Sequence, residues 1–310
     1  MNFVGDIRMS KPLVTVFTST YNRRHTLERV YNSLCSQTVK NFEWVVIDDG
    51  SSDGTEALIE NLKSVAPFDI VYVWKENGGK HTSYNLLPEV AKSDLFFSLD
   101  SDDAITTNCL QVLIDKYHEA QFTYGKSYAG VMCLARDEHG QIMGDLFTDD
   151  DHGKDVVRVL LNHKKLGDKG CLCTIDLLRE FPFPAEVTRV YVPESIHIHA
   201  YSKKYKMLYV NQDLLLGWKS EGGDHLTDVM QKKSNLPGAI YGLLAWPSYS
   251  MRYFFVRPKL YIAVVTKYVA VANALGWPIR KQFAMIQSIP GKLLCFICYP
   301  IGLLRLALNR

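Results

Sequence analysis

The sequence predicts an α/β protein with a mostly parallel central sheet, flanking helices and a C-terminal helical extension. In the first hundred residues, β-branched and aromatic runs alternate with segments whose apolar residues recur every three or four positions, which is the pattern of βαβ units. The unusual polar residues directly follow the apolar runs, and such sheets bind ligands beyond the carboxyl ends of their strands. From residue 229 onward, long apolar blocks are broken only by basic or neutral polar residues, glycine and proline.

The elements follow one another at short spacing. We expect strands at 13–18, 42–47, 70–73 and 95–99. A helix should follow each of the first three strands. Thr26 is the expected N-cap of the first helix, and Asp53 of the second, where Glu56 would complete a capping box. The glycine-rich loop Gly78-Gly79-Lys80-His81 should open the third helix.

Composition indicates an ordinary globular protein. The 310 residues are 47% hydrophobic and 22% charged, and the length allows a large core. Seven cysteines, an odd number, lie in apolar surroundings, which favours a reducing compartment. Neither Cys171 with Cys173 nor Cys295 with Cys298 has a second pair at zinc spacing, so we expect no structural zinc site. Residues 1–10 contain no apolar run, so we expect no signal peptide.

Charge is distributed unevenly along the chain. Residues 229–310 contain eleven Lys or Arg and no Asp or Glu, whereas residues 1–228 carry 24 basic and 33 acidic side chains, a net charge of −9. This asymmetry indicates that the basic tail faces an anionic surface, either phospholipid or nucleic acid.

Three carboxylates follow the fourth expected strand. Asp100, Asp102 and Asp103 come directly after Phe96–Leu99, and so much like charge is costly unless a cation shares it. Side chains of a strand alternate, so Asp100 and Asp102 should point to the same side and approach one ion. The alternative is a solvated acidic turn, because Asp is also a favoured turn residue.

A second acidic loop follows the second expected strand. Counted from Asp49, residues 49–60 match the spacing of an EF-hand calcium loop. That match is false, because a strand precedes the loop and a continuous helical pattern runs through its second half. The chain also lacks the P-loop motif, and its first turn lacks the Gly-x-Gly-x-x-Gly of dinucleotide-binding folds.

Four motifs in order resemble those of family 2 glycosyltransferases with the GT-A fold. They are the segments 16–23, 46–54, 77–80 and 99–103, and the resemblance is strong over residues 12–110 and weaker to about residue 225. It implies that Asp49 accepts a hydrogen bond from a uracil base and that Asp102 holds a divalent cation, Mn²⁺ or Mg²⁺, on the diphosphate. It further implies donor contacts from Ser19, Tyr21, Lys80 and Asp100, of which Lys80 suits the diphosphate.

An inverting transfer also needs a general base for the acceptor hydroxyl. By the same resemblance, Glu194, which follows Pro193 and precedes a helical stretch reaching Tyr205, matches that position. A Glu in a first helical turn can equally serve the helix dipole. Glu186 and Asp213 are weaker candidates for the base.

Other residues have less definite expected roles. The segment 167–170, with Asp168 and Lys169, resembles a family segment near the sugar and acceptor, although turn residues explain it as well. His225 would be a further metal ligand, but its sequence context departs from the usual His-Gly-Gly order. We interpret His197 and His199 as structural or acceptor-facing.

The basic tail is expected to be helical. In residues 259–280 the polar residues repeat every seven positions and form a narrow stripe on an apolar helix, which Pro278 should end or kink; they are Lys259, Thr266, Asn273 and Arg280. The apolar segment 293–304 looks too short to span a bilayer and is interrupted by Pro300 and Gly302. These helices either pack on the catalytic domain or dock in the plane of an anionic bilayer, and we favour docking over binding to nucleic acid.

The sequence therefore predicts a metal-dependent inverting glycosyltransferase that uses a nucleotide sugar, with UDP as the expected nucleotide. Residues 1–228 would form the catalytic domain, with a nucleotide-binding half (1–110) and an acceptor half (111–228), and residues 229–310 a membrane-associating extension. The acceptor would be a lipid-linked saccharide or glycan in bacterial surface polysaccharide synthesis, on the cytoplasmic face of the membrane.

Two alternatives remain open. A magnesium phosphohydrolase or nucleotidyltransferase could use Asp100 and Asp102, but Asp103-Ala104 stands where a phosphatase signature has Gly followed by Thr or Val. A non-catalytic, membrane-docked module could bind a nucleotide sugar.

Overall fold

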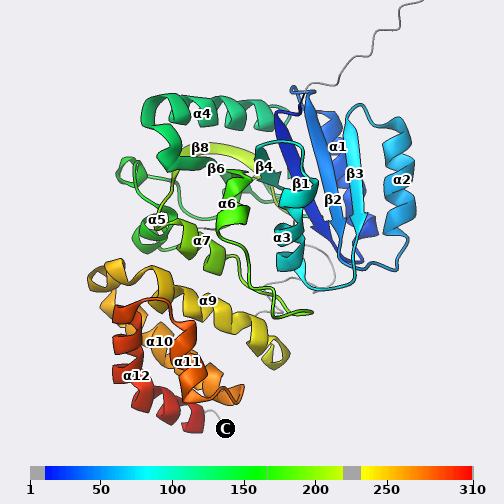
Figure 1. Ribbon diagram of the computed structural model, residues 1–310. Coiled ribbons are helices and arrows are strands. Elements are labelled where there is room, and N and C mark those ends of the chain that lie inside the picture. Colours follow the sequence, from blue (N-terminus) through cyan, green and yellow to red (C-terminus); the bar gives the residue numbers. More distant parts are fainter. Residues whose placement is uncertain (1–10, 166, 219–231, 309–310) are drawn as a thin grey trace, which may run out of the picture.

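The computed structural model describes residues 11–165, 167–218 and 232–308. A mixed sheet with flanking helices forms one part of the molecule, and a layer of C-terminal helices forms the other (Figure 1). The strands are β1 (Val14–Thr20), β2 (Phe42–Asp48), β3 (Asp69–Trp74), β4 (Leu95–Ser98), β5 (Ala104–Ile105), β6 (Tyr128–Arg136), β7 (Lys169–Thr174) and β8 (Lys206–Leu216). The helices are α1 (Arg24–Cys35), α2 (Thr55–Val65), α3 (Lys80–Val90), α4 (Cys109–Tyr124), α5 (Val156–Asn162), α6 (Asp176–Glu180), α7 (Ser195–Tyr201), α9 (Leu236–Tyr249), α10 (Pro258–Ala274), α11 (Ile279–Met285) and α12 (Ile289–Leu308).

The sheet has the strand order β3-β2-β1-β4-β7-β6-β8-β5. Strands β3, β2, β1 and β4 pair in parallel, as the alternating pattern predicted. Strand β7 is antiparallel to both β4 and β6, β5 is antiparallel to β8, and β6 pairs with β8 in parallel. The predicted α/β fold with a mostly parallel sheet is confirmed, and β5 and β7 are the reversed strands.

Both faces of the sheet are covered, which explains the continuous apolar runs of its strands. All seven residues of β2 are buried. Trp44 and Val46 face one core cluster with residues of α1, α2 and α4, whereas Val45 and Ile47 face the other with residues of α3, α7 and the C-terminal helices. The second cluster therefore joins the sheet to the C-terminal layer.

The expected helix caps are wrong in detail. Helix α1 begins at Arg24, so Thr26 lies inside its first turn and donates its hydroxyl to the Arg23 carbonyl. The Asp53 carboxylate accepts from the Thr55 amide at 3.2 Å and hydroxyl at 2.6 Å, at the start of α2, and also from the Arg24 amide at 2.9 Å. Helix α2 follows Gly54, and the predicted capping box with Glu56 is not formed. Asp53 thus joins the starts of two helices.

The C-terminal helices differ from expectation in two ways. The chain does break before Pro278, but of the predicted polar stripe only Lys259 and Arg280 are exposed, whereas Thr266 is buried and donates back to the Ile262 carbonyl. Helix α12 runs for 20 residues through Pro300, which is exposed and costs one backbone hydrogen bond, so the expected interruption is wrong. Among the described residues, α12 is the helix long and apolar enough to cross a membrane.

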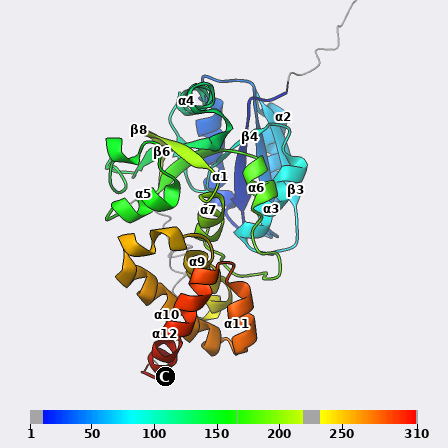
Figure 2. The same ribbon diagram turned by 60° about the vertical axis from the view of Figure 1, so that its left-hand side comes forward.

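The C-terminal layer lies beside the carboxyl ends of the parallel strands. Figures 1 and 2 show α9–α12 gathered at one end of the molecule, and Figure 1 shows β1–β3 pointing toward that end. Helix α9 contacts α7 of the sheet part and α10 and α12 of the layer. The predicted domain boundary at residues 228 and 229 lies outside the described residues.

Candidate active site

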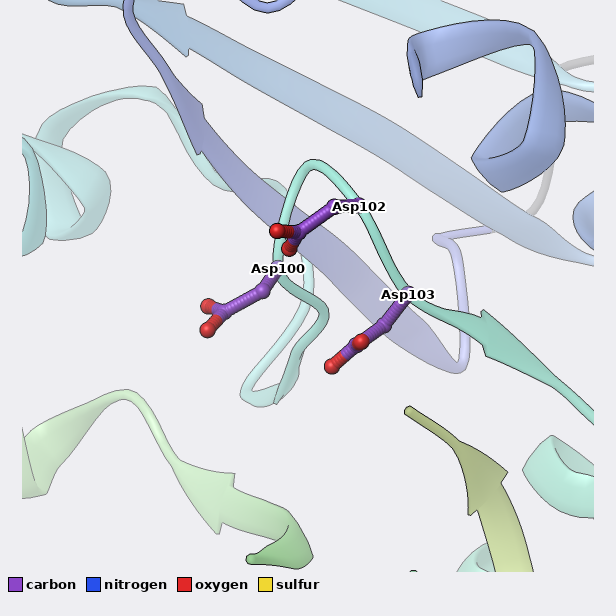
Figure 3. Close-up of side chains that lie close together, drawn as sticks. All are labelled: Asp100, Asp102 and Asp103. Atoms are coloured by element: carbon purple, nitrogen blue, oxygen red, sulfur yellow. The ribbon is translucent and has the colours of Figure 1, made fainter. Parts of the chain in front are cut away.

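An acidic turn after β4 gathers three carboxylates. Oxygen atoms of Asp100, Asp102 and Asp103 all lie within 4.8 Å of one another, and the three side chains point to the same side of the loop (Figure 3). The Asp103 amide donates to the Asp100 carbonyl at 3.2 Å, which closes the turn. Strand alternation was therefore the wrong reason for the expected proximity, because these residues lie in a turn beyond the end of β4 at Ser98.

The electrostatics of this turn favour a cation. Burial, followed by repulsion from Asp100, raises the pKa of Asp102. The same two causes, with Asp102 adding to the repulsion, raise the pKa of Asp103 to about 8. A divalent ion would relieve this repulsion, and three carboxylates suit the oxygen preference of Mg²⁺ and Mn²⁺.

Three basic side chains contact the acidic turn. Lys80, the first residue of α3, reaches the Asp100 carboxylate at 2.8 Å. Arg23, just before α1, lies 3.4 Å from the Asp102 carboxylate, and Arg29 donates to the Asp102 carbonyl at 2.7 Å. The turn is thus held at the meeting point of loops that follow β1, β3 and β4.

Glu194 shares a partner with this turn. It lies immediately before α7, and its carboxylate is 3.0 Å from the Lys80 ammonium, which simultaneously contacts Asp100. Burial opposes the charge of Lys80, but the two carboxylates outweigh burial and hold the pKa of Lys80 well above its usual value. The Tyr84 hydroxyl also lies 3.3 Å from Glu194. The expected base is therefore one side chain away from the acidic turn.

The alternative bases have other partners. Glu186 accepts a hydrogen bond from the Tyr241 hydroxyl at 2.7 Å, and Asp213 pairs with Arg136 at 3.2 Å. Both expected structural histidines are buried: His197 bonds the Phe181 carbonyl and His199 the Ser250 hydroxyl. Glu194, by contrast, is the candidate whose partner Lys80 also contacts the acidic turn, and both histidines lie inside the fold.

The segment that carries Glu194 is held by the C-terminal layer. The side chain of Asn235, buried just before α9, accepts from the Tyr191 amide at 2.8 Å and donates to the Tyr191 carbonyl at 3.1 Å. A Cβ atom on Gly238 would lie 2.2 Å from that same carbonyl, so only glycine allows this approach. Helix α9 therefore positions the backbone three residues before Glu194.

A second polar site surrounds Asp49, directly after β2. The Asp49 side chain is 5% exposed and accepts from the amides of Gly78 and Gly79 at 2.8 and 2.7 Å. The Lys75 ammonium forms an ion pair with the same carboxylate. The loop after β3 thus fixes Asp49 and adds a positive charge beside it.

The other donor-side residues lie at the end of β1. Ser19 is half-buried within β1, and Tyr21, directly after the strand, is 50% exposed. The Asp49 amide donates to the Thr20 carbonyl at 2.8 Å, which brings this end of β1 beside Asp49. Ser19, Tyr21 and Asp49 therefore come from neighbouring strand ends.

The two residues expected on the sugar side, Asp168 and Lys169, have different surroundings. The negative charge of Asp168 is the smallest of the causes that raise the pKa of Asp103. Lys169, at the start of β7, donates to the Met143 carbonyl at 2.8 Å. His225 lies outside the described residues.

Two residues of the site, Lys75 and Asn235, were not predicted from the sequence. Lys75 directly follows β3, so the rule that ligands bind at strand ends could have identified it. Asn235 carried no such signal, because its contact with Tyr191 joins residues 44 positions apart.

The chain is similar to known glycosyltransferases. The protein-family model described as Glycosyl transferase family 2 matches residues 15–172. A putative teichuronic acid biosynthesis glycosyltransferase of Bacillus subtilis, TuaG, is 29% identical over 127 residues, which are 41% of this chain and 50% of TuaG. The GalNAc(5)-diNAcBac-PP-undecaprenol beta-1,3-glucosyltransferase of Campylobacter jejuni is 31% identical over 110 residues, 35% of each protein. The chain thus spans half or less of the length of these relatives.

A solved structure extends the likeness beyond the family match. Residues 1–349 of S. aureus TarS, in complex with UDP-GlcNAc, superpose with a TM-score of 0.53 at 15% identity, covering 96% of this chain and 92% of that one. At this identity the likeness shows the fold. Because the family match spans about half of the chain, the protein belongs to the family 2 glycosyltransferases.

Proposed function

We propose that the protein transfers a sugar from a nucleoside-diphosphate sugar to an acceptor hydroxyl with inversion. The observation that carries this proposal is the Lys80 bridge, which joins Asp100 of the acidic turn to Glu194 at 2.8 and 3.0 Å. The bridge brings a candidate metal turn and a candidate base to one site, which a transfer from a diphosphate to a hydroxyl requires.

Each residue has a defined part in the proposed transfer. Glu194 takes the proton of the acceptor hydroxyl, the acceptor oxygen bonds to the anomeric carbon, and the bond to the diphosphate breaks. Asp102, with Asp100 and Asp103, would hold Mn²⁺ or Mg²⁺, which neutralises charge on the leaving diphosphate. Lys80 contacts the diphosphate, and Asp168 faces the sugar or the acceptor.

We propose uracil as the donor base, held by Asp49 with Ser19 and Tyr21. The Asp49 carboxylate accepts and the adjacent Lys75 ammonium donates. Uracil presents an N–H beside a carbonyl oxygen and fits this pair. Guanine shares that edge, whereas adenine and cytosine present a bare ring nitrogen there. The pair therefore supports UDP and GDP over ADP and CDP, and the UDP-GlcNAc bound by TarS supports UDP as the first choice.

The acceptor is proposed to be a lipid-linked saccharide or glycan in bacterial surface polysaccharide synthesis. The names of relatives support this. One is named for an undecaprenol-linked saccharide, and TuaG and GgaA of Bacillus subtilis are named for teichuronic acid and minor teichoic acid biosynthesis. We place the enzyme on the cytoplasmic face of the membrane, where its basic tail meets anionic lipid. No role for nucleic acid is proposed.

Nucleoside diphosphate release tests the proposal. The purified chain is incubated with UDP- and GDP-sugars, Mn²⁺ and undecaprenyl-diphosphate-linked saccharides, and products are identified by mass spectrometry. We expect UDP release and a lipid-linked product one sugar larger, both abolished by chelator. Release of free phosphate or nucleoside monophosphate in place of a glycosylated product would indicate the hydrolase or nucleotidyltransferase alternative.

A further inference from the structure

Helix α12 exposes an apolar face that nothing in the described chain covers. Five of its residues are buried against the layer: Gly291, Leu294, Cys295, Cys298 and Gly302. At 3.6 residues per turn, its exposed apolar residues lie on the opposite face. The large ones are Ile289 (74% exposed), Leu293 (61%), Phe296 (72%), Ile297 (69%), Ile301 (54%), Leu303 (42%) and Leu304 (60%).

Such a stripe is unusual for a surface that only meets water. A surface helix normally turns its apolar face inward and its polar face outward. Here both faces are apolar, and contiguous exposed apolar patches mark interaction sites. By the same helical geometry, Lys292 and Arg305 lie at the two borders of the exposed stripe.

The contacts of α12 hold it within the layer. A Cβ atom on Gly291 would lie 2.0 Å from the Pro247 carbonyl of α9, and one on Gly302 would lie 2.5 Å from Val269 of α10. Ser288 donates to the same Pro247 carbonyl at 2.6 Å. Both ends of α12 are thus packed closely on α9 and α10, although its length and hydropathy would allow it to span a membrane.

Charge identifies the occupant of the exposed face. Residues 229–310 contain eleven basic and no acidic side chains. In a symmetric dimer the same patch faces itself, so cations would meet cations without acidic partners. An anionic phospholipid surface complements both the apolar stripe and the basic residues that border it.

We propose that α12 lies in the plane of an anionic bilayer, with the stripe from Ile289 to Leu304 inserted between the headgroups and the acyl chains. This inference rests on the proposed membrane location but not on the proposed chemistry. It names the docking surface: α12 remains packed on α9 and α10 and does not cross the bilayer. Because α9 also positions the segment before Glu194, docking would hold the candidate base at a set height above the lipid.

Vesicle flotation of the full chain tests the proposal. We compare vesicles of phosphatidylcholine alone with vesicles containing 30% phosphatidylglycerol, at low and high salt. We expect flotation with the anionic vesicles and at least about a threefold loss of the bound fraction at high salt. Equal flotation with both vesicle types, or with neither, would overturn the proposal.

A pair of matched variants locates the surface. Phe296→Ser with Ile297→Ser, both exposed on α12, should lower the bound fraction at least about tenfold. Phe122→Ser is the control, because Phe122 is 96% exposed on α4 at the opposite end of the molecule (Figure 1). Equal losses in both variants, or none in the α12 variant, would contradict the assigned surface.

Two further readouts separate the rival occupants. Light scattering should show the same mass for the wild type and the α12 variant, and a dimer that the variant abolishes would establish a second copy as the occupant. A tag after Arg310 should stay open to protease on sealed vesicles, and its protection would establish a spanning helix. UDP binding without lipid should be unchanged in the α12 variant, so failure of the proposed chemistry remains distinguishable from failure of docking.

Discussion

Strands β1–β4 and the C-terminal layer contribute to the candidate site in different ways. We call these four strands, with the loops that follow them, the donor half. At the ends of β1, β2, β3 and β4, short motifs place charged and polar side chains directly at the site, among them Asp49, Lys80 and Asp102. The layer α9–α12 contributes no motif, yet Asn235 and Gly238 hold the backbone before Glu194. The donor half therefore carries the candidate chemical groups, whereas the layer holds the backbone beside one of them.

The largest expected effect lies in the donor half. Asp102→Asn removes one of the three carboxylates of the acidic turn, and we expect turnover to fall about 10⁴-fold, because a metal supplies several kcal/mol to a charged leaving group. The measurement is the initial rate of UDP release at saturating Mn²⁺. Asp115→Asn, on the exposed face of α4, is the matched control and should keep the wild-type rate. Comparable rates in the two variants would mean that the acidic turn does not hold the metal.

The next prediction concerns Glu194, which lies where the donor half and the C-terminal layer meet. Glu194→Gln should lower kcat about 10³-fold, because the acceptor hydroxyl loses its base, while the Kd for UDP stays within about twofold. Rates are compared with those of Glu186→Gln, the weaker candidate, which should be nearly as active as the wild type. If Glu186→Gln is the inactive variant, the base has been assigned to the wrong residue.

A smaller effect tests the positional role of the layer. Asn235→Ala removes both bonds to the Tyr191 backbone, and we expect kcat to fall about 10- to 100-fold with little change in the Kd for UDP, because the base is displaced. The Tm should fall by roughly 2–4 °C for each kcal/mol lost.

Asn211→Ala supplies the control for this prediction. Asn211 makes the same paired bonds to the backbone of Phe147, at 2.9 and 2.8 Å. It should lower the Tm without lowering kcat. Equal losses of kcat in both variants would mean that Asn235 contributes only to stability.

The smallest effect concerns the pocket proposed for the uracil base. Lys75→Met leaves the amides of Gly78 and Gly79 on Asp49 but removes the adjacent donor, so the Kd for UDP should rise about fivefold at unchanged kcat. The measurement is a titration with UDP, with Lys63→Met on the exposed side of α2 as the control. A change in kcat with an unchanged Kd would mean that Lys75 does not contact the uracil base.

Features that depend on residues close together in the sequence could be predicted. The four parallel strands and the acidic turn could be predicted because apolar period and strand-end residues lie within a few positions of one another. Prediction failed where contacts between segments far apart in the sequence determine the structure. Thr26 was expected as a cap, but Asp53 of the next loop binds the Arg24 amide. Lys75 was missed among ordinary charged residues, although its place after β3 was available as a signal.

The C-terminal layer shows why the remainder could not be predicted. Thr266 was expected in a polar stripe with Lys259, but packing of α10 against its neighbours buries Thr266, whereas Lys259 stays exposed. Pro300 was read as a stop, although an exposed proline costs a long, well-packed helix only one hydrogen bond. Periodicity shows that a helix has two faces, and only tertiary contacts determine which face is covered.

Calorimetric titration with UDP tests the central claim most directly. The claim is that the acidic turn and Asp49 together form a metal-dependent site for a uridine diphosphate. Wild-type protein with Mn²⁺ should bind UDP more tightly than GDP, and either chelator or Asp102→Asn should weaken binding at least about tenfold. Unchanged UDP affinity in chelator, or no binding of UDP or GDP with Mn²⁺ present, would contradict the assignment.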